Sequence, residues 1–312
     1  MIRSASGETL VVGTRGSQLA RAQTQWVLDR LQACYPDLSI QTEIISTAGD
    51  RQRIKPLPEI GGKGLFTEDL ERALLAGSID LAVHSAKDLP TRLTEGLEVL
   101  AYPAREDPRD AWISADGRWF DELPDGSTVG TSSLRRQAQL LMHRKDLTFI
   151  GLRGNVDTRI KKVHRGDCAG AVLAMAGLIR TGLTQHVTHP FEPAICLPAP
   201  GQGALALEGR CGDDRIREYL QVIHDELTAT AVECERAVLK ELDAGCRAPV
   251  AVYARVVEDE LQCEALVSDP RGERFIRVEA SYSPSQPDMV VQQIVDELRL
   301  QRADDIIAEC RQ

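Results

Sequence analysis

The sequence lacks several features that mark whole classes of protein. It has no surplus of basic residues: its net charge of −10 argues against general affinity for nucleic acid, because phosphate contacts need a basic face. It has no apolar run of membrane-spanning length, and its first residues, MIRSASGETL, contain no apolar core of a signal peptide. We therefore expect a globular, cytoplasmic protein without nucleic-acid or membrane partners, and nothing in the sequence requires more than a monomer.

Cysteine and histidine show no metal-binding pattern. The eight cysteines include no CxxC pair and no metal-ligand spacing, so neither a metal site nor a disulfide framework is indicated. His186 and His189 are spaced as two ligands could be, but without a third ligand nearby they are interpreted as ordinary loop residues. Cys246 follows a glycine at the end of a predicted helix, where a thiol could be exposed and activated by Arg247; an inert thiol is the alternative.

What the sequence does contain is a repeated α/β pattern over 312 residues, enough for two or three domains. Strands and helices alternate in two successive units, which are separated by a charged, proline-rich hinge, AYPAREDPRDAW (101–112), and followed by a return strand after Gly203. A helix, three strands and a last helix over 288–310 complete the chain. We assign residues 1–103 with 204–224 to domain 1, 104–203 to domain 2 and 225–312 to domain 3.

The stretch IDLAVHSAKDLP, residues 79–90, changes abruptly from apolar to polar. Its first half alternates as a buried strand does, and its last residue, a proline, disfavours helical geometry before it. Residues 84–88 are therefore predicted to form a loop at the carboxyl end of a strand, where open α/β sheets bind ligands. Lys87 and Asp88 carry opposite charges that are costly to bury without a partner or a task, and a solvated surface turn is the alternative.

Arginines follow several predicted strand ends. They are Arg15, Arg135, Arg136, Arg153 and Arg159. Two of these arginines open a helix predicted over 134–143, where cations oppose the helix dipole, and this suggests an anion bound there. Guanidinium groups match two oxygens of a carboxylate or phosphate at once, so this set of arginines predicts a polyanion site; a solvated helix face is the alternative. In the turn that carries Arg15, Ser17 is predicted to be the N-cap of the helix after the first strand.

Six motifs are spread along the chain: GGKGLF (61–66), HSAKDLP (84–90), AREDPRDA (104–111), GTSSLRRQ (130–137), LRGNVDTR (152–159) and LDAGCRAPV (242–250). GGKG alone does not match a phosphate-binding loop. The six motifs occur in the order found in porphobilinogen deaminases, also called hydroxymethylbilane synthases. The sequence resembles that family over nearly its whole length, and six motifs in register are far more specific than any one of them.

The resemblance implies a transferase of tetrapyrrole biosynthesis. Such an enzyme joins four porphobilinogen molecules head to tail, releases ammonia at each step and liberates linear hydroxymethylbilane by hydrolysis. The implied fold has two wound α/β lobes like those of periplasmic binding proteins, joined by a double crossover, plus a small C-terminal α+β domain with a three-stranded sheet and helices. A dipyrromethane cofactor, bound to a cysteine as a thioether, primes the polymer, and the motif position assigns that cysteine to Cys246.

The resemblance also implies roles for individual residues. Asp88 matches the family's catalytic carboxylate, and Lys87 beside it is the second implied catalytic residue, which could assist with charge or bind substrate carboxylates. The implied cofactor-binding positions are Cys246, Asp88, Lys87, Thr131, Ser132, Ser133, Arg135, Arg136, Arg153 and Gly154. The implied substrate-binding positions are Arg15, Ser17, Lys63, Phe66, Arg153, Arg159 and Gln202. Asp50 and the loop to Ile60 resemble the family's mobile lid, where Glu59 replaces a residue that is often basic and Lys55 could supply the missing charge.

The chemistry of the implied reaction agrees with these residue types. Loss of ammonia from an aminomethylpyrrole leaves an azafulvene cation, so the catalyst must protonate the leaving amine and then stabilise positive charge, and one carboxyl group can do both. Each pyrrole carries acetate and propionate groups, so the growing product accumulates negative charge that grouped arginines can bind. A two-lobed solute-binding protein is the non-enzymatic alternative, but it gives no role to Cys246.

Overall fold

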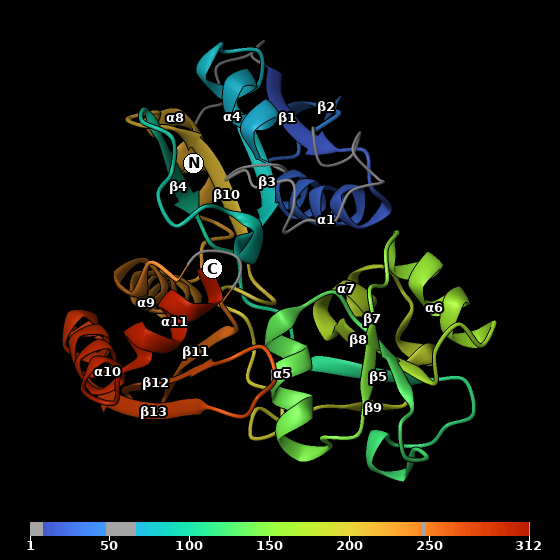
Figure 1. Ribbon diagram of the computed structural model, residues 1–312. Helices are drawn as coiled ribbons and strands as arrows, with labels where there is room; N and C mark the ends of the chain where they lie inside the picture. The colour runs from blue at the N-terminus through green and yellow to red at the C-terminus, as the bar shows by residue number, and fades with distance from the viewer. Residues whose placement is uncertain (1–8, 48–66, 245–247, 312) are drawn as a thin grey trace. The chain divides into compact units, whose positions relative to one another are not determined.

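The computed structural model describes residues 9–47, 67–244 and 248–311 (Figure 1). The chain divides into two compact units: residues 1–105 with 204–229, and residues 106–203 with 230–312. The chain therefore leaves the first unit and returns to it before it enters the second unit again. No helix in the described ranges is both long enough and apolar enough to cross a membrane.

The first unit contains a five-stranded mixed sheet in the order β2-β1-β3-β10-β4. β1 pairs in parallel with β2 and β3, whereas β10 runs antiparallel between β3 and β4. Helices α1 and α8 pack on one face of the sheet and α4 on the other, because their apolar residues recur at helical spacing. The elements are β1 (Thr9–Arg15), α1 (Gln18–Cys34), β2 (Ser39–Ile45), α4 (Glu68–Leu75), β3 (Leu81–Ser85), the 3-10 helix η1 (Ala86–Asp88), β4 (Leu97–Ala101), β10 (Leu205–Arg210) and α8 (Asp214–Leu220).

The first part of the second unit repeats this architecture, with a mixed sheet in the order β7-β6-β8-β5-β9. β6 lies parallel to β7 and β8, and β5 lies antiparallel between β8 and β9. Trp112 of β5 is fully buried against the rings of Phe120 and Phe191. The elements are β5 (Asp110–Ser114), η2 (Phe120–Glu122), β6 (Thr128–Gly130), α5 (Leu134–His143), β7 (Thr148–Ile150), α6 (Val156–His164), β8 (Gly170–Ala174), α7 (Met175–Arg180), η3 (Thr184–His186) and β9 (His189–Pro190).

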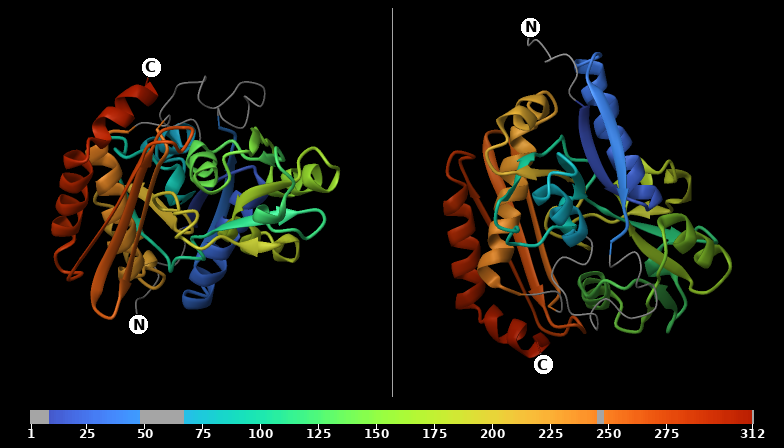
Figure 2. Two further views of the ribbon diagram at one scale, coloured as in Figure 1. Left: turned by 60° about the horizontal axis from the view of Figure 1, so that its bottom comes forward. Right: turned by 90° about the horizontal axis from the view of Figure 1, so that it is seen from above.

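The C-terminal part of the second unit is a three-stranded antiparallel sheet covered on one face by helices (Figure 2). Alternate strand residues such as Val250 and Val252 face these helices, while Ala251 and Leu266 on the opposite face pack against Leu197 and Met142 of the preceding lobe. The elements are α9 (Glu226–Leu242), whose first four residues still belong to the first unit, β11 (Val250–Val257), β12 (Glu260–Ser268), β13 (Phe275–Tyr282), α10 (Pro287–Leu300) and α11 (Ala303–Arg311).

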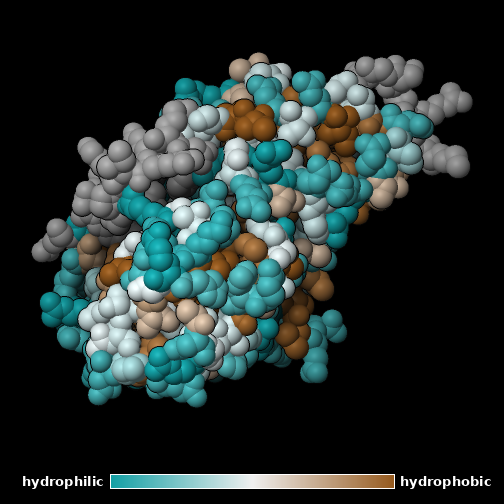
Figure 3. Space-filling model, turned by 90° about the vertical axis from the view of Figure 1, so that its right-hand side faces the viewer, coloured by the Kyte–Doolittle hydropathy of each residue, from teal (hydrophilic) through white to brown (hydrophobic). Residues whose placement is uncertain are grey.

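The predicted fold class is confirmed: two wound, mixed α/β lobes are joined by a double crossover, and a small α+β domain with a three-stranded sheet follows. The helix predicted over 134–143 is α5, and Ser17 is the N-cap of α1, where its hydroxyl accepts a hydrogen bond from the amide of Ala20 at 3.2 Å. Some large apolar side chains, such as Ile44 and Leu300, are exposed, and Figure 3 shows one face with its mixture of polar and apolar residues.

Three predictions about secondary structure are wrong. Residues 84–88 do not form a loop, because β10 supplies antiparallel partners for His84 and Ser85 and the chain then makes a 3-10 turn. The single helix predicted over 288–310 is two helices, since Arg302 has a left-handed φ of 69° between α10 and α11. The proline-rich hinge ends earlier than predicted, because β5 begins at Asp110.

Candidate functional site

A cavity of about 50 Å³ lies in the first unit at the carboxyl ends of β1 and β3. These strands are parallel, so the residues that end them meet at one edge of the sheet. The structure thus brings together Arg15, Ser17 and Asp88, which the sequence predicted as site residues. The cavity lining includes Arg15, Ser17, Thr67, His84, Ser85 and Asp88.

The turn that carries Lys87 and Asp88 is held from both sides. The side-chain amide of Gln23 in α1 donates to the Ser85 hydroxyl at 2.9 Å. The amide of Ala86 donates to the carbonyl of Ala204, just before β10, at 3.0 Å. Lys87 and Asp88 themselves are exposed, and Asp88 lines the cavity.

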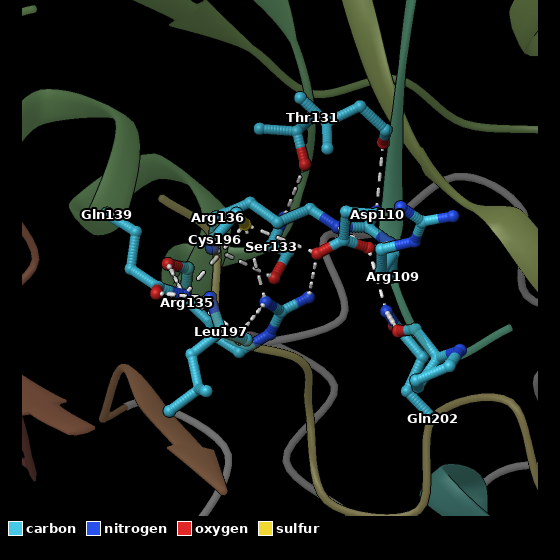
Figure 4. Close-up of polar contacts among 12 residues, drawn as sticks. Arg109, Asp110, Thr131, Ser133, Arg135, Arg136, Gln139, Cys196, Leu197 and Gln202 are labelled. Atoms are coloured by element: carbon cyan, nitrogen blue, oxygen red, sulfur yellow. Dashed lines mark hydrogen bonds and ion pairs between the residues drawn. The ribbon is translucent and has the colours of Figure 1, made fainter. Parts of the chain in front are cut away.

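A second cluster lies in the second unit around Asp110, whose side chain is fully buried (Figure 4). Its Oδ1 accepts from Arg136 Nη2 at 2.6 Å, from Arg136 Nε at 3.1 Å and from Gln202 Nε2 at 2.9 Å. Its Oδ2 accepts from Arg135 Nη2 at 2.7 Å and from the thiol of Cys196 at 3.3 Å. The anion that the sequence predicts near these two arginines is thus supplied, in the described part of the chain, by Asp110.

The two arginines of this cluster hold the buried Asp110 carboxyl group in its ionised state. Burial alone would raise the pKa of Asp110, but the charges and hydrogen bonds of Arg135 and Arg136 outweigh it and keep that pKa well below its usual value. Burial and the Asp110 charge raise the pKa of Cys196 to about 12, so this cysteine is a neutral thiol. Two guanidiniums against one carboxylate leave a surplus of positive charge in a buried site.

The turn before α5 and the loop before α6 lie beside this cluster. The Ser133 hydroxyl caps α5, and the Thr131 hydroxyl accepts from the amide of Ser133 at 3.2 Å. The hydroxyl of Ser132 donates to the carbonyl of Leu152 at 3.3 Å and so ties the two segments together. The structure therefore brings the predicted residues 131–136 next to the segment that carries Arg153.

Arg159 lies partly buried near Arg136. Its Nε donates to the carbonyl of Gly154 at 2.9 Å, and Gly154 has a φ of +110°, a conformation that side chains rarely adopt. Burial, and then the like charge of Arg136, lower the pKa of Arg159. An incoming carboxylate would relieve both effects, so the residues present fit a cofactor or substrate that carries carboxylates.

Asp110 and Arg180 are two residues of this region that the sequence did not predict as site residues. Asp110 belongs to the motif at 104–111, but nothing in that motif shows which cations it meets. Arg180, at the end of α7, donates to the carbonyl of Gly203 at 2.7 Å, and burial lowers its pKa to about 10. Gln202, predicted to bind substrate, is buried and donates to the carbonyl of Pro108 and to Asp110, so its substrate role stays a prediction.

Several predicted site residues lie outside the described ranges. They are Lys63, Phe66 and Cys246, together with Asp50, Lys55 and Glu59 of the predicted lid. Their roles stay predictions. Within the described ranges no group of three or more His, Cys, Asp or Glu side chains could hold a metal ion.

Comparison with known proteins identifies the family. A family model described as "Porphobilinogen deaminase, dipyromethane cofactor binding domain" matches residues 10–218, and the model of the C-terminal domain of the same family matches residues 229–299. The chain belongs to the porphobilinogen deaminase family. The porphobilinogen deaminase of Syntrophotalea carbinolica is 46% identical over 97% of this chain and 96% of its own length. That of Desulforudis audaxviator is 47% identical over 97% of this chain and 98% of its own length.

Membership of the porphobilinogen deaminase family confirms the predicted activity. The enzyme is a transferase that makes hydroxymethylbilane from porphobilinogen in tetrapyrrole biosynthesis, and it has a dipyrromethane-cofactor-binding domain. The solute-binding alternative is therefore wrong. Among solved structures, the alkanesulfonate-binding protein SsuA from Xanthomonas axonopodis pv. citri covers 77% of this chain and 76% of its own at 13% identity, with a TM-score of 0.38. A likeness at that level carries no argument about function.

Proposed function

We propose that Asp88 is the catalytic carboxyl group of this deaminase. The observation that supports the proposal is that Asp88 and Arg15 line one cavity, at the ends of two parallel strands. A pyrrole that places its acid side chain against Arg15 can then present its aminomethyl group or ring N–H to Asp88. Asp88 protonates the leaving amine and afterwards faces the positive charge that spreads over the ring. Lys87 in the same turn assists as a second charged group.

The cluster in the second unit is proposed to hold the cofactor. When bound, the dipyrromethane supplies the free pyrrole end at which the polymer grows. The surplus charge around Asp110 and the partly buried guanidinium of Arg159 both favour carboxylates, which supports this assignment. The cofactor residues proposed here are Cys246, Lys87, Asp88, Thr131, Ser132, Ser133, Arg135, Arg136, Arg153 and Gly154. Those proposed for substrate are Arg15, Ser17, Lys63, Phe66, Arg153, Arg159 and Gln202.

The proposed division of labour follows three domains. Domain 1 (1–103 and 204–224) carries Asp88, domain 2 (104–203) carries the arginine cluster, and domain 3 (225–312) carries the cofactor cysteine, Cys246. We propose that the protein acts in the cytoplasm. We also propose that it is a monomer, since the reaction as proposed needs residues of one chain alone. Analytical ultracentrifugation tests the monomer, because a dimer at micromolar concentration would contradict it.

Intact-protein mass spectrometry tests the thioether. Freshly purified protein is expected to exceed the polypeptide mass by two linked pyrrole units, and the excess should be absent from Cys246→Ala. Cys34→Ala is the matched control, because Cys34 is an exposed cysteine in α1 that lies far from Cys246 in the sequence. This variant should keep the excess mass. A bare polypeptide mass in folded wild-type protein, or an excess that survives in Cys246→Ala, would contradict the assignment.

A further inference from the structure

A buried pair of ionisable side chains, His84 and Glu208, lies at the cavity of Asp88, and His84 is part of the cavity wall. His84 Nε2 is 3.0 Å from Glu208 Oε2, and the exposed fractions of the two side chains are 3% and 0%. The separation is that of an ion pair, although the angle is not that of a hydrogen bond. Neither oxygen of Glu208 has a hydrogen-bond donor within the described residues. Among the described residues, His84 is the ionisable group within ion-pair distance of the Glu208 carboxyl group, and burying a polar group without a partner is costly.

The sheet register explains why the two side chains meet. Ala206 of β10 lies opposite His84 of β3, and Glu208 lies opposite Ala82. Glu208 and His84 are therefore diagonal neighbours on one face of the sheet, within reach of long side chains. Ala82 on that face packs under α4, which excludes water from the pair. The return strand β10 thereby gains a second attachment to β3 besides the backbone ladder.

This attachment lies at the base of the turn that carries Asp88. His84 and Ser85 end β3, and Asp88 is the last residue of the single 3-10 turn that follows. The backbone of Ala86 in that turn is also tied to Ala204 next to β10. Because Asp88 itself is exposed, its direction depends on how this base is held.

We propose that Glu208 is a positioning residue for Asp88 and acts through His84. The inference rests on the proposed catalytic role of Asp88. Glu208 fixes the His84 ring, and with it the end of β3 from which the catalytic turn starts. Displacement of a reacting group by roughly 1 Å can cost about a hundredfold in rate, so Glu208, which does not line the cavity, can still affect turnover through His84, which does.

The test compares two buried carboxylates of the same lobe. Glu208→Gln keeps the shape and removes the charge that faces His84. Glu71→Gln is the matched control, because Glu71 in α4 is also buried but pairs with the hydroxyl of Thr94 instead. We expect kcat of Glu208→Gln to fall by about tenfold or more while KM and cofactor content stay unchanged, and kcat of Glu71→Gln to stay close to wild type. Equal kcat values for the two variants, or a change in KM alone, would overturn the proposal.

A second variant covers the case in which Glu208→Gln does not fold. Glu208→Asp retains the charge and withdraws it from His84 by one methylene, so it should fold and still turn over slowly; a wild-type kcat in this variant refutes the positioning role. Asp88→Asn distinguishes failure of the catalytic role of Asp88 from failure of the positioning role of Glu208. If Asp88→Asn is fully active, the proposed function fails. If it is inactive while both Glu208 variants match wild type, only the present inference fails.

Discussion

Replacing Asp110 with asparagine should destabilise the second lobe strongly. Asp110 is fully buried, and its two oxygens accept from Arg135, Arg136 and Gln202. In Asp110→Asn one oxygen becomes an NH2 group that must point at N–H donors, and both guanidiniums lose the charge that compensates them. Removing one partner of a buried ion pair costs about 3–5 kcal/mol of unfolding free energy. For a unit of this size that predicts a fall in Tm of about 6–20 °C.

Tryptophan fluorescence during urea unfolding can measure this loss in the correct lobe. Trp112 lies in β5 two residues after Asp110, and Trp119 follows in the same lobe, whereas Trp26 lies in α1 of the first unit. A Trp26→Phe background therefore reports the second lobe alone. Asp116→Asn is the matched control, because Asp116 also pairs with an arginine, Arg118, but both side chains are about half exposed. Surface pairs contribute little, so this variant should unfold near the wild-type urea concentration.

The pH dependence of the difference in unfolding free energy between wild type and Asp110→Asn shows whether the charge of Asp110 causes it. The folded-state pKa of Asp110 lies below the unfolded value of about 3.9, so its contribution is present above that pH and is lost as the pH falls toward the folded-state pKa. The gap between wild type and Asp110→Asn should therefore be largest near neutrality and shrink in acid. A loss no greater than that of Asp116→Asn at neutral pH would refute the reasoning.

Two further predictions concern single side chains. Asp88→Asn should retain the wild-type unfolding transition, because Asp88 is exposed, but its kcat should fall by about 10²–10⁴-fold in an assay of ammonia release; wild-type turnover would remove Asp88 from the mechanism. Burial and Asp110 raise the pKa of Cys196 to about 12, so iodoacetamide at mildly alkaline pH should leave Cys196 unmodified in the folded protein. The same treatment should alkylate the exposed Cys34 and Cys211. Peptide mass mapping measures the labelling, and a labelled Cys196 would contradict the prediction.

The features that the sequence predicts correctly are those encoded locally. Ser17 before an apolar periodic run marks the start of α1, and the same signals place α5 at residues 134–143. Arg15 is the last residue of β1 and Asp88 lies in the turn after the parallel strand β3, which is why they share a cavity. Family motifs, rather than periodicity, single out Asp88 and Cys246 as functional.

The features that the sequence does not predict depend on distant partners. Arg135 and Arg136 indicate an anion, but Asp110 precedes them by 25 and 26 residues. It reaches them because β5 inserts antiparallel between β8 and β9, an arrangement that local composition does not encode. His84 was predicted to lie in a loop for the same reason, since its strand partner in β10 comes long afterwards in the chain. Propensity alone could not reveal either contact.

The position of β10 also affects the order in which the two sheets can form during synthesis on the ribosome. Until residues 205–210 emerge, β3 and β4 lack the strand that separates them and leave open edges, which are prone to wrong pairing. All strands of the other sheet, β5 to β9, are made in the meantime, and at typical synthesis rates this interval lasts roughly 5–20 s. The lobe translated second can therefore finish its sheet first, and a nascent chain stalled before β10 would be a natural client for chaperones.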